Sequence, residues 1–326
     1  MEIDGKKIQL FTLSANKQIA EEISKESGIP LSSISVARFA DGEINLNIED
    51  SVRGNHIFVV QPTSNPVNEH LMELLIMTDA LKRASAASIT LIVPYFGYSR
   101  QDRKSKSRQP ITAKLVANLI ETAGANRVVS IDLHAAQIQG FFDIPIDNFP
   151  AAPLLASYFQ ELNMKNIVVV SPDHGGATRA RGFARFFEAP IAIIDKRRPS
   201  PNETEVMNVI GEVKGKTCIV IDDMIDTGGT LIEGAKALIK NGAKEVYACA
   251  THGVFSRDAL DRLENSCVKK VVVTNTIYHE NIEKYSKIKV LGIGNLLGRS
   301  ILNIISDQPI SQIFENIYKD NPQSWN

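Results

Sequence analysis

Short, continuous runs of apolar and mostly β-branched residues recur along the chain. They lie at residues 57–60, 89–93, 128–131, 167–170, 191–194, 218–221 and 271–273. Strands that are buried on both faces have continuous apolar runs of this kind, whereas a half-exposed strand alternates apolar and polar residues. The pattern therefore predicts strands in the interior of parallel sheets.

Helical spacing of apolar residues separates several of these runs. Apolar residues between 71 and 81 recur three and four positions apart, and those between 115 and 123 do the same before Gly124, which favours a helix end. A strand, a helix and a further strand in succession predict crossover units and parallel sheet. The predicted fold class is α/β, with two tandem doubly wound parallel-sheet lobes.

The length of the chain favours two lobes over one. A chain of 326 residues fits two domains of roughly 150 residues each. The segments 127–132 and 216–222 resemble one another, since each is an apolar strand that ends in Ile-Asp. Prolines and small residues interrupt the periodicity near 148–153. We expect a first lobe at 1–150, a second at 151–306, and a tail at 307–326 that packs back on the first lobe.

Composition and charge exclude several classes of protein. Hydrophobic residues make up 44% and charged residues 22% of the chain, as in ordinary globular proteins. The net charge of −1 provides no general attraction for nucleic acid or for an acidic membrane surface. No apolar run approaches the ~18 residues of a membrane span, and three scattered cysteines suit a reducing compartment. We therefore expect a cytoplasmic protein with no nucleic-acid or membrane partner.

The densest cluster of polar side chains follows the run at 218–221. Two adjacent carboxylates, Asp222 and Asp223, come at the end of the predicted strand, and a turn then leads into a helical pattern. The turn residues are Asp226, Thr227, Gly228, Gly229 and Thr230. Unpaired backbone N–H groups at the start of a helix bind phosphate. A ribose with two vicinal hydroxyls would lie between the carboxylates and the phosphate, so the segment predicts a ribose 5-phosphate site.

This segment resembles the signature of type I phosphoribosyltransferases, in which the two acids hold the 2- and 3-hydroxyls of the ribose. Further segments extend the resemblance over nearly the whole chain to the ribose-phosphate diphosphokinases, which use the phosphoribosyltransferase fold in both lobes. They lie at residues 38–43, 94–104, 132–143, 171–176 and 195–199. The resemblance implies transfer of the terminal diphosphate of MgATP to the 1-hydroxyl of ribose 5-phosphate. The products would be AMP and 5-phosphoribosyl 1-diphosphate, a precursor in nucleotide biosynthesis.

The resemblance also implies how individual residues act. Lys196 and Arg198 would stabilise charge that develops on the transferred diphosphate, and Arg198 would also bind the sugar phosphate. As residues two apart in an extended segment, they face the same way. The basic loop at 100–108 resembles a catalytic lid that excludes water. The ATP site would consist of Phe39, Asp41, Gly42, Glu43, Arg100, Gln101 and His134.

A magnesium site is expected at two further positions. His134 and Asp173 each follow a predicted strand, at the edge where open α/β sheets bind their ligands. A carboxylate and a neutral imidazole suit Mg²⁺ that keeps most of its waters and is bridged by phosphates, and the matching residues of the family contact the metal or its water shell. Taken alone, a histidine in such a place more often makes ordinary hydrogen bonds.

The resemblance finally implies an assembly and an effector. Residues 39–43 match those that receive adenine from a neighbouring subunit, so we expect a homo-oligomer. The family resemblance implies that this oligomer is a hexamer. A phosphate or ADP effector would bind at a subunit interface, at residues that include Ser51, Arg53, Ser85 and Arg108. Pro309 stands where the family usually has serine. Proline removes both a hydroxyl and a backbone donor, so we expect weak activation by phosphate.

Two other functions fit parts of the pattern. A phosphoribosyltransferase that joins a base to phosphoribosyl diphosphate would explain residues 218–230, but would leave the basic loop and the first lobe without a role. A catalytically silent regulatory relative would be expected to have lost site residues or gained insertions, and the sequence shows neither.

Overall fold

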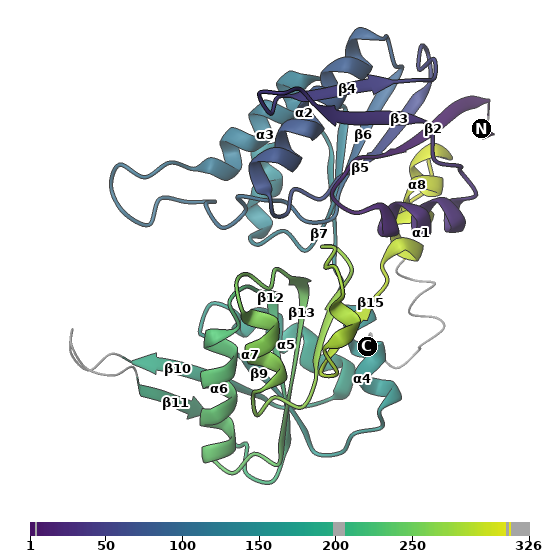
Figure 1. Cartoon of the computed structure of the whole chain (residues 1–326). Coiled ribbons are helices and arrows are strands. Elements are labelled where there is room, and N and C mark those ends of the chain that lie inside the picture. The colour runs from purple at the N-terminus through teal and green to yellow at the C-terminus, as the bar shows by residue number, and fades with distance from the viewer. Residues whose placement is uncertain (4, 198–205, 311–312, 314–326) are drawn as a thin grey trace. The chain divides into compact units, whose positions relative to one another are not determined.

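A computed structural model describes residues 1–3, 5–197, 206–310 and 313 of the chain (Figure 1). These residues form two compact units. The first contains residues 1–150, 276–278 and 292–313, and the second contains residues 151–275 and 279–291. Each unit is described by itself below.

The first unit is built on a six-stranded sheet with the order β1-β2-β5-β6-β7-β8. Its strands are β1 (Glu2–Ile3), β2 (Lys6–Thr12), β5 (His56–Val60), β6 (Ser88–Val93), β7 (Arg127–Ile131) and β8 (Ile146–Phe149). All neighbouring pairs are parallel except β1 with β2. The short 3-10 helix η1 (Ala136–Phe141) follows β7. This sheet has the interior parallel strands that the apolar runs predict.

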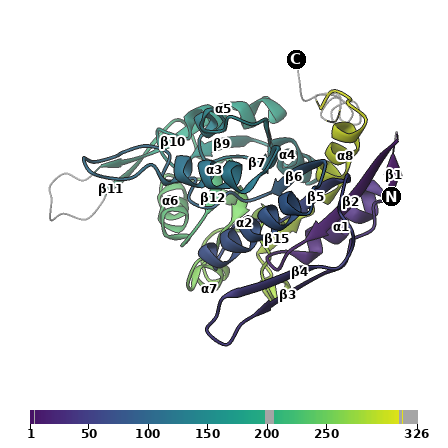
Figure 2. The same ribbon diagram turned by 90° about the horizontal axis from the view of Figure 1, so that it is seen from above.

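Helices α2 (Val67–Arg83) and α3 (Thr112–Ala123) cover one face of this sheet. Their apolar sides, which include Leu74 and Ile120, are fully buried against strand residues such as Val59. A separate antiparallel hairpin of β3 (Ile34–Arg38) and β4 (Ile44–Ile48) packs along α2 (Figure 2). This hairpin is not among the strands expected from the apolar runs, because its strands alternate apolar and polar residues and lack a continuous run.

Helix α8 (Gly294–Ile305) belongs to the first unit, where it packs on α1 (Lys17–Ser27). Glu22 of α1 accepts from the N–H of Gly294 at 3.2 Å, and Arg299 donates to Glu26 at 3.1 Å. The sequence pattern places this segment in the second lobe, with a boundary at residue 306. The assignment differs because the apolar side of α8 is buried on α1, far away in the sequence. Beyond α8, Asp307 pairs with Lys6 at 2.9 Å, and residues 311–312 and 314–326 of the expected tail lie outside the described residues.

The second unit contains a seven-stranded sheet with the order β11-β10-β9-β12-β13-β14-β15. Its strands are β9 (Ile167–Ser171), β10 (Ile191–Arg197), β11 (Val206–Ile210), β12 (Thr217–Ile225), β13 (Glu245–Gly253), β14 (Val271–Thr274) and β15 (Ile288–Leu291). Only β11 runs antiparallel to its neighbour. The long strand β12 therefore lies in the middle of the sheet, between β9 and β13.

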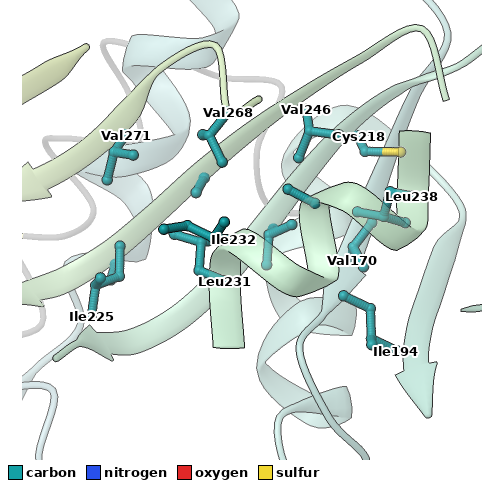
Figure 3. Close-up of a cluster of buried hydrophobic side chains, with 14 of the residues drawn as sticks. Val170, Ile194, Cys218, Ile225, Leu231, Ile232, Leu238, Val246, Val268 and Val271 are labelled. Carbon is teal, nitrogen blue, oxygen red and sulfur yellow. The ribbon is translucent and has the colours of Figure 1, made fainter. Parts of the chain in front are cut away.

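Helices cover both faces of the second sheet. Ile232 and Leu238 of α6 (Gly229–Lys240) pack with Cys218 and Val170 of the strands, as Figure 3 shows, and α7 (Ala259–Glu264) adds Leu263 to the same core. On the other face lie α4 (Ala152–Glu161) and α5 (Ala177–Ala184). The Phe159 ring of α4 and the Phe183 ring of α5 meet edge to face, with their centroids 6.4 Å apart. Two further 3-10 turns are η2 (Arg185–Phe187) and η3 (Ile282–Lys284). The α/β prediction is confirmed.

Candidate active site

Strand β12 carries two carboxylates near its carboxyl end, and it runs to Ile225, beyond the end expected at residue 221, because its pairing with β13 continues past the aspartates. Asp222 pairs in register with Ala250 of β13, and its side chain is 37% exposed, whereas that of Asp223 is only 6% exposed. The N–H of Asp223 donates to Asp222 Oδ1 at 2.9 Å. The strand thus fixes a partly buried acid beside a more deeply buried one.

The turn after β12 leads directly into α6. Gly228 has φ +70° and ψ −5°, a left-handed conformation that glycine adopts without strain, and its carbonyl accepts the first helical bond from Ile232 at 3.0 Å. The segment after β13 supports the turn from outside, because the N–H of Ser256 donates to the carbonyl of Asp226 at 3.2 Å. Arg262 of α7 donates to the carbonyl of Thr227 at 3.3 Å. The turn is held on its carbonyl side, and the first N–H groups of α6 are those that a helix leaves unpaired.

Asp222 and the turn line one cavity of about 230 Å³, whereas the buried Asp223 is not among its lining residues. Of the residues predicted for the site, it brings together Asp173, Asp222, Asp226, Thr227, Gly228, Gly229 and Thr230. Ala248 and Cys249 of β13 line its inner wall. Burial raises the pKa of the Cys249 thiol well above its ordinary value, so this wall is uncharged at neutral pH. The cavity therefore combines carboxylates, hydroxyls and a helix start in one place.

Burial is the largest influence on the Asp222 carboxyl, and the neighbouring Asp223 adds to it. Together they raise the pKa of Asp222 to about 7, although Arg179 acts in the opposite direction. The Arg179 guanidinium lies 2.8 Å from Asp222 and 3.2 Å from Asp223. The acid pair is thus poised to change its charge near neutral pH.

Asp173 lies in the tight turn between β9 and α5. Its Oδ1 accepts from the N–H of Gly176 at 2.9 Å, and Ser171 Oγ donates to its carbonyl at 2.6 Å. A Cβ on Gly176 would lie 2.7 Å from that hydroxyl, so the turn needs glycine there. His174 of the same turn is 3.0 Å from Asp195 of β10. These bonds hold the Asp173 carboxylate at the cavity.

A hard oxygen ligand such as Asp173 fits a magnesium ion that is bound mostly through water and phosphate. Among the described residues, no group of three or more acidic, histidine or cysteine side chains is arranged to hold a metal by itself. His134, the other expected ligand, follows β7 in the first unit and is half-buried.

The residues predicted to receive adenine form the tip of the β3–β4 hairpin. The N–H of Phe39 donates to the carbonyl of Glu43 at 2.8 Å, and Asp41 accepts from the N–H of Glu43 at 3.1 Å. Gly42 closes the turn with φ +95°, and the Phe39 ring is 53% exposed. An exposed aromatic ring beside two acids can stack on a base and accept its amino hydrogens.

A buried network anchors this hairpin to α2. Arg38 precedes the tip and bonds Glu73 at 3.0 Å and Glu69 at 3.2 Å. The Glu73 side chain is fully buried and also accepts from Ser14 Oγ at 2.6 Å. Burial alone would raise the pKa of Glu73, but these hydrogen bonds and one from Gln61 hold it below its ordinary value.

The basic loop runs between β6 and α3 without helix or strand. Arg100 is exposed, and the Gln101 side chain accepts from Thr112 at the start of α3. Asp102 accepts from Gln137 of η1 at 2.6 Å. The root of the loop is therefore tied to its own unit, while its basic residues face solvent.

Lys196 lies within β10, opposite Met207 of β11. The apolar run predicts a strand that ends at residue 194, with Lys196 after it; this is wrong, because antiparallel pairing with β11 extends β10 to Arg197. Arg198 lies outside the described residues. The catalytic roles of Lys196 and Arg198 remain predictions.

The segment expected to bind an effector is partly described. The N–H of Gly54, the residue after Arg53, donates to the carbonyl of Ser85 at 2.9 Å. The carbonyl of Pro309 accepts from Asn303 at 2.9 Å. Residues 311–312 and 314 of the expected pocket lie outside the described residues.

Three residues near these sites were not predicted from the sequence. Arg179 and Arg262 meet the sugar site from helices, and Glu73 anchors the hairpin from inside the first unit. Arg179 stands in a stretch with other arginines, so nothing in the local pattern distinguishes it. Only the packing of α5 against β12 brings it to the two aspartates.

Similar proteins carry these features together. Models of the N-terminal domain of ribose phosphate pyrophosphokinase and of the phosphoribosyl synthetase-associated domain match residues 8–124 and 197–315. The ribose-phosphate pyrophosphokinase of Bacillus subtilis is 56% identical over 309 residues, which are 95% of this chain and 98% of that protein. That of Corynebacterium ammoniagenes is 56% identical over 94% of this chain and 97% of its own. The structure of phosphoribosylpyrophosphate synthetase from Mycobacterium smegmatis has a TM-score of 0.88 at 43% identity, covering 93% of this chain and 100% of that one.

The fold and the site define a two-unit α/β protein with parallel sheets and a glycine-containing turn at the end of a central strand. The extent of the similarity identifies it further. The chain belongs to the ribose-phosphate pyrophosphokinase family, as the sequence analysis predicted. Within the described residues, no helix combines the length and the apolar character needed to cross a bilayer.

Proposed function

We propose that this protein transfers the β,γ-diphosphate of ATP to the 1-hydroxyl of ribose 5-phosphate. The observation that carries the proposal is the single cavity in which Asp222, Asp173 and the turn before α6 meet. A sugar phosphate needs groups that accept hydrogen bonds from its hydroxyls at one end and groups that donate hydrogen bonds to its phosphate at the other. This cavity offers both.

In this proposal the ribose lies on the acid pair. Asp222 and Asp223 accept from the 2- and 3-hydroxyls, and Asp226 orients the sugar ring. The 5-phosphate binds the first N–H groups of α6, with the Thr227 and Thr230 hydroxyls as further donors and Gly228 and Gly229 allowing close approach. Arg262, which is bonded to the turn, adds positive charge beside it.

The sugar O1 attacks the β-phosphorus of ATP in line. The bond between that phosphorus and the oxygen that bridges it to the α-phosphorus breaks, AMP leaves, and the O1 proton passes to solvent or to a nearby base. Lys196 and Arg198 stabilise charge on the transferred group, and Arg198 also contacts the sugar phosphate. No covalent enzyme intermediate is required.

The same proposal assigns ATP to the first unit. Its adenine binds at the hairpin tip formed by Phe39, Asp41, Gly42 and Glu43, and its phosphates meet Arg100, Gln101 and His134. Asp173 and His134 would hold Mg²⁺. The bound ion would neutralise part of the charge on the phosphates.

Because the hairpin tip serves a neighbouring chain in this proposal, the active form is a homo-oligomer, a hexamer. We further propose a cytoplasmic location, with phosphate or ADP as an effector that binds near Ser51, Arg53, Ser85 and Arg108. The exposed Phe39 ring supports the proposal of a homo-oligomer, because an aromatic side chain of that size is usually buried against other protein atoms.

An end-point assay tests the proposed reaction. The protein is incubated with ATP, magnesium and ribose 5-phosphate, and AMP is measured with and without the sugar. We expect AMP only when the sugar is present, together with one 5-phosphoribosyl 1-diphosphate for each AMP. A protein that instead consumed that product with a free base would be a phosphoribosyltransferase, and one that formed no AMP would be a regulatory relative.

A further inference from the structure

The strongest unassigned feature of the second unit is a forked ion pair beneath the sugar site. Arg179 projects from α5, which packs against β12 and β9. Its Nη1 lies 2.8 Å from Asp222 Oδ1 and its Nη2 lies 3.2 Å from Asp223 Oδ1. One guanidinium therefore bridges both carboxylates that the proposed function assigns to the ribose.

The fork has a geometric consequence. Arginine is planar and presents its donors in a fixed arrangement, so the single contact that each terminal nitrogen makes fixes the position of one oxygen on each carboxylate. On Asp222, both Arg179 and the N–H of Asp223 bond the same oxygen, Oδ1. The carboxyl group can then rotate little, and the direction of its other oxygen is set.

The fork also has an electrostatic consequence. Burial and the adjacent Asp223 both oppose ionisation of Asp222, and Arg179 is the group that lowers its pKa against them. The other acids that line the cavity are Asp173 and Asp226, while the Thr227 and Thr230 hydroxyls and the Cys249 thiol are uncharged. Removing Arg179 would leave several acids together without the cation, so Asp222 would hold its proton to higher pH.

We infer that Arg179 is the positioning residue that holds Asp222, with the buried Asp223 behind it, in the orientation that receives two vicinal hydroxyls, and thereby selects ribose 5-phosphate over a sugar that lacks one of them. This inference rests on the proposed function. A sugar without the 2-hydroxyl leaves one oriented, partly desolvated carboxylate without its partner, which costs more than the loss of a flexible contact. Discrimination between the two sugars therefore depends on the contacts of Arg179 with the acids as well as on the acids themselves.

The test compares ribose 5-phosphate with 2-deoxyribose 5-phosphate in three variants. Arg179→Met removes the positive charge and both contacts to the carboxylates but keeps a side chain of similar length. Arg179→Lys keeps the positive charge but cannot contact both carboxylates through a planar guanidinium. Arg181→Met is the matched control, because Arg181 is exposed two residues further along the same helix. Steady-state kcat and KM are measured for each sugar and for ATP between pH 6 and 9.

We expect Arg179→Met to raise KM for ribose 5-phosphate about tenfold or more, as for loss of one charge-assisted interaction. KM for ATP should stay within about twofold. The preference for ribose over deoxyribose should fall about tenfold, and the acid limb of the pH profile for the sugar should move to higher pH. Arg179→Lys should recover part of the pH effect but little of the preference.

The inference is overturned if Arg179→Met and Arg179→Lys keep the wild-type sugar preference, as Arg181→Met should. It is also overturned if the two Arg179 variants lower kcat/KM equally for the sugar and for ATP and lower Tm as well, because that pattern indicates a structural role. A wild-type protein that forms no sugar-dependent AMP would overturn the proposed function instead, so the two failures are distinguishable.

Discussion

Replacing Gly228 by alanine tests whether the conformation of the turn before α6 binds the 5-phosphate. Gly228 has φ +70°, and a Cβ built there would lie 3.4 Å from Leu263, which is an ordinary contact. The substitution therefore causes no collision, and its cost is the strain of a left-handed alanine, roughly 1 kcal/mol. That strain should lower Tm by a few degrees.

The strain should also disturb binding, because the turn can relieve it only by rotating the backbone N–H groups that open α6. Loss of one charge-assisted hydrogen bond to the phosphate costs about 1.5–3 kcal/mol. KM for ribose 5-phosphate should then rise about 10- to 100-fold, while KM for ATP stays nearly constant. Steady-state kinetics and thermal denaturation of the same preparation measure both effects.

Gly215 provides a matched control in the same unit. It has φ +71°, nothing lies within 4 Å of a Cβ built on it, and it does not line the sugar cavity. Gly215→Ala should lower Tm about as much as Gly228→Ala and leave the kinetics unchanged. If Gly228→Ala kept the wild-type KM while losing the same stability, the turn would not be the phosphate site.

Four further predictions concern other parts of the site. Lys196→Ala and Arg198→Ala should each lower kcat by about two orders of magnitude or more, while the affinity for ATP stays within about tenfold of the wild-type value. A loss confined to substrate affinity would show that the two residues are not catalytic. Mixed oligomers of Glu43→Ala and Lys196→Ala chains should recover activity, and no recovery in verified hybrids would argue against a shared adenine site. Asp222→Asn should weaken ribose 5-phosphate binding before that of ATP. The raised pKa makes the folded protein bind the Asp222 proton more tightly than the unfolded chain does, so the contribution of Asp222 to stability falls as pH rises from about 4 to about 7. Compared with the wild type at each pH, Asp222→Asn should therefore have the higher Tm at pH 8 and lose this advantage toward pH 4. An equal Tm difference at both pH values would contradict the raised pKa. Pro309→Ser should strengthen phosphate activation about tenfold or more, and equal phosphate responses in the two proteins would refute that role of proline.

Much of the molecule is determined by local features of the sequence. The apolar runs at 167–170 and 218–221 lie in β9 and β12, because a strand buried on both faces must be apolar at consecutive positions. The aspartate pair and the glycines of the turn are adjacent in the chain, so their arrangement follows from a strand, a turn and a helix start. The family resemblance adds the residues of the hairpin tip and the basic loop, which periodicity alone does not indicate.

The tertiary structure decided the contacts between segments that are far apart in the sequence. Arg179 meets Asp222 across 43 positions, and Arg38 meets Glu73 across 35. Helix α8 joins the first unit through Arg299 and Glu26, which are 273 residues apart. Periodicity tells which side of an element is apolar, but not which other element covers it, because that choice depends on the packing of all elements together.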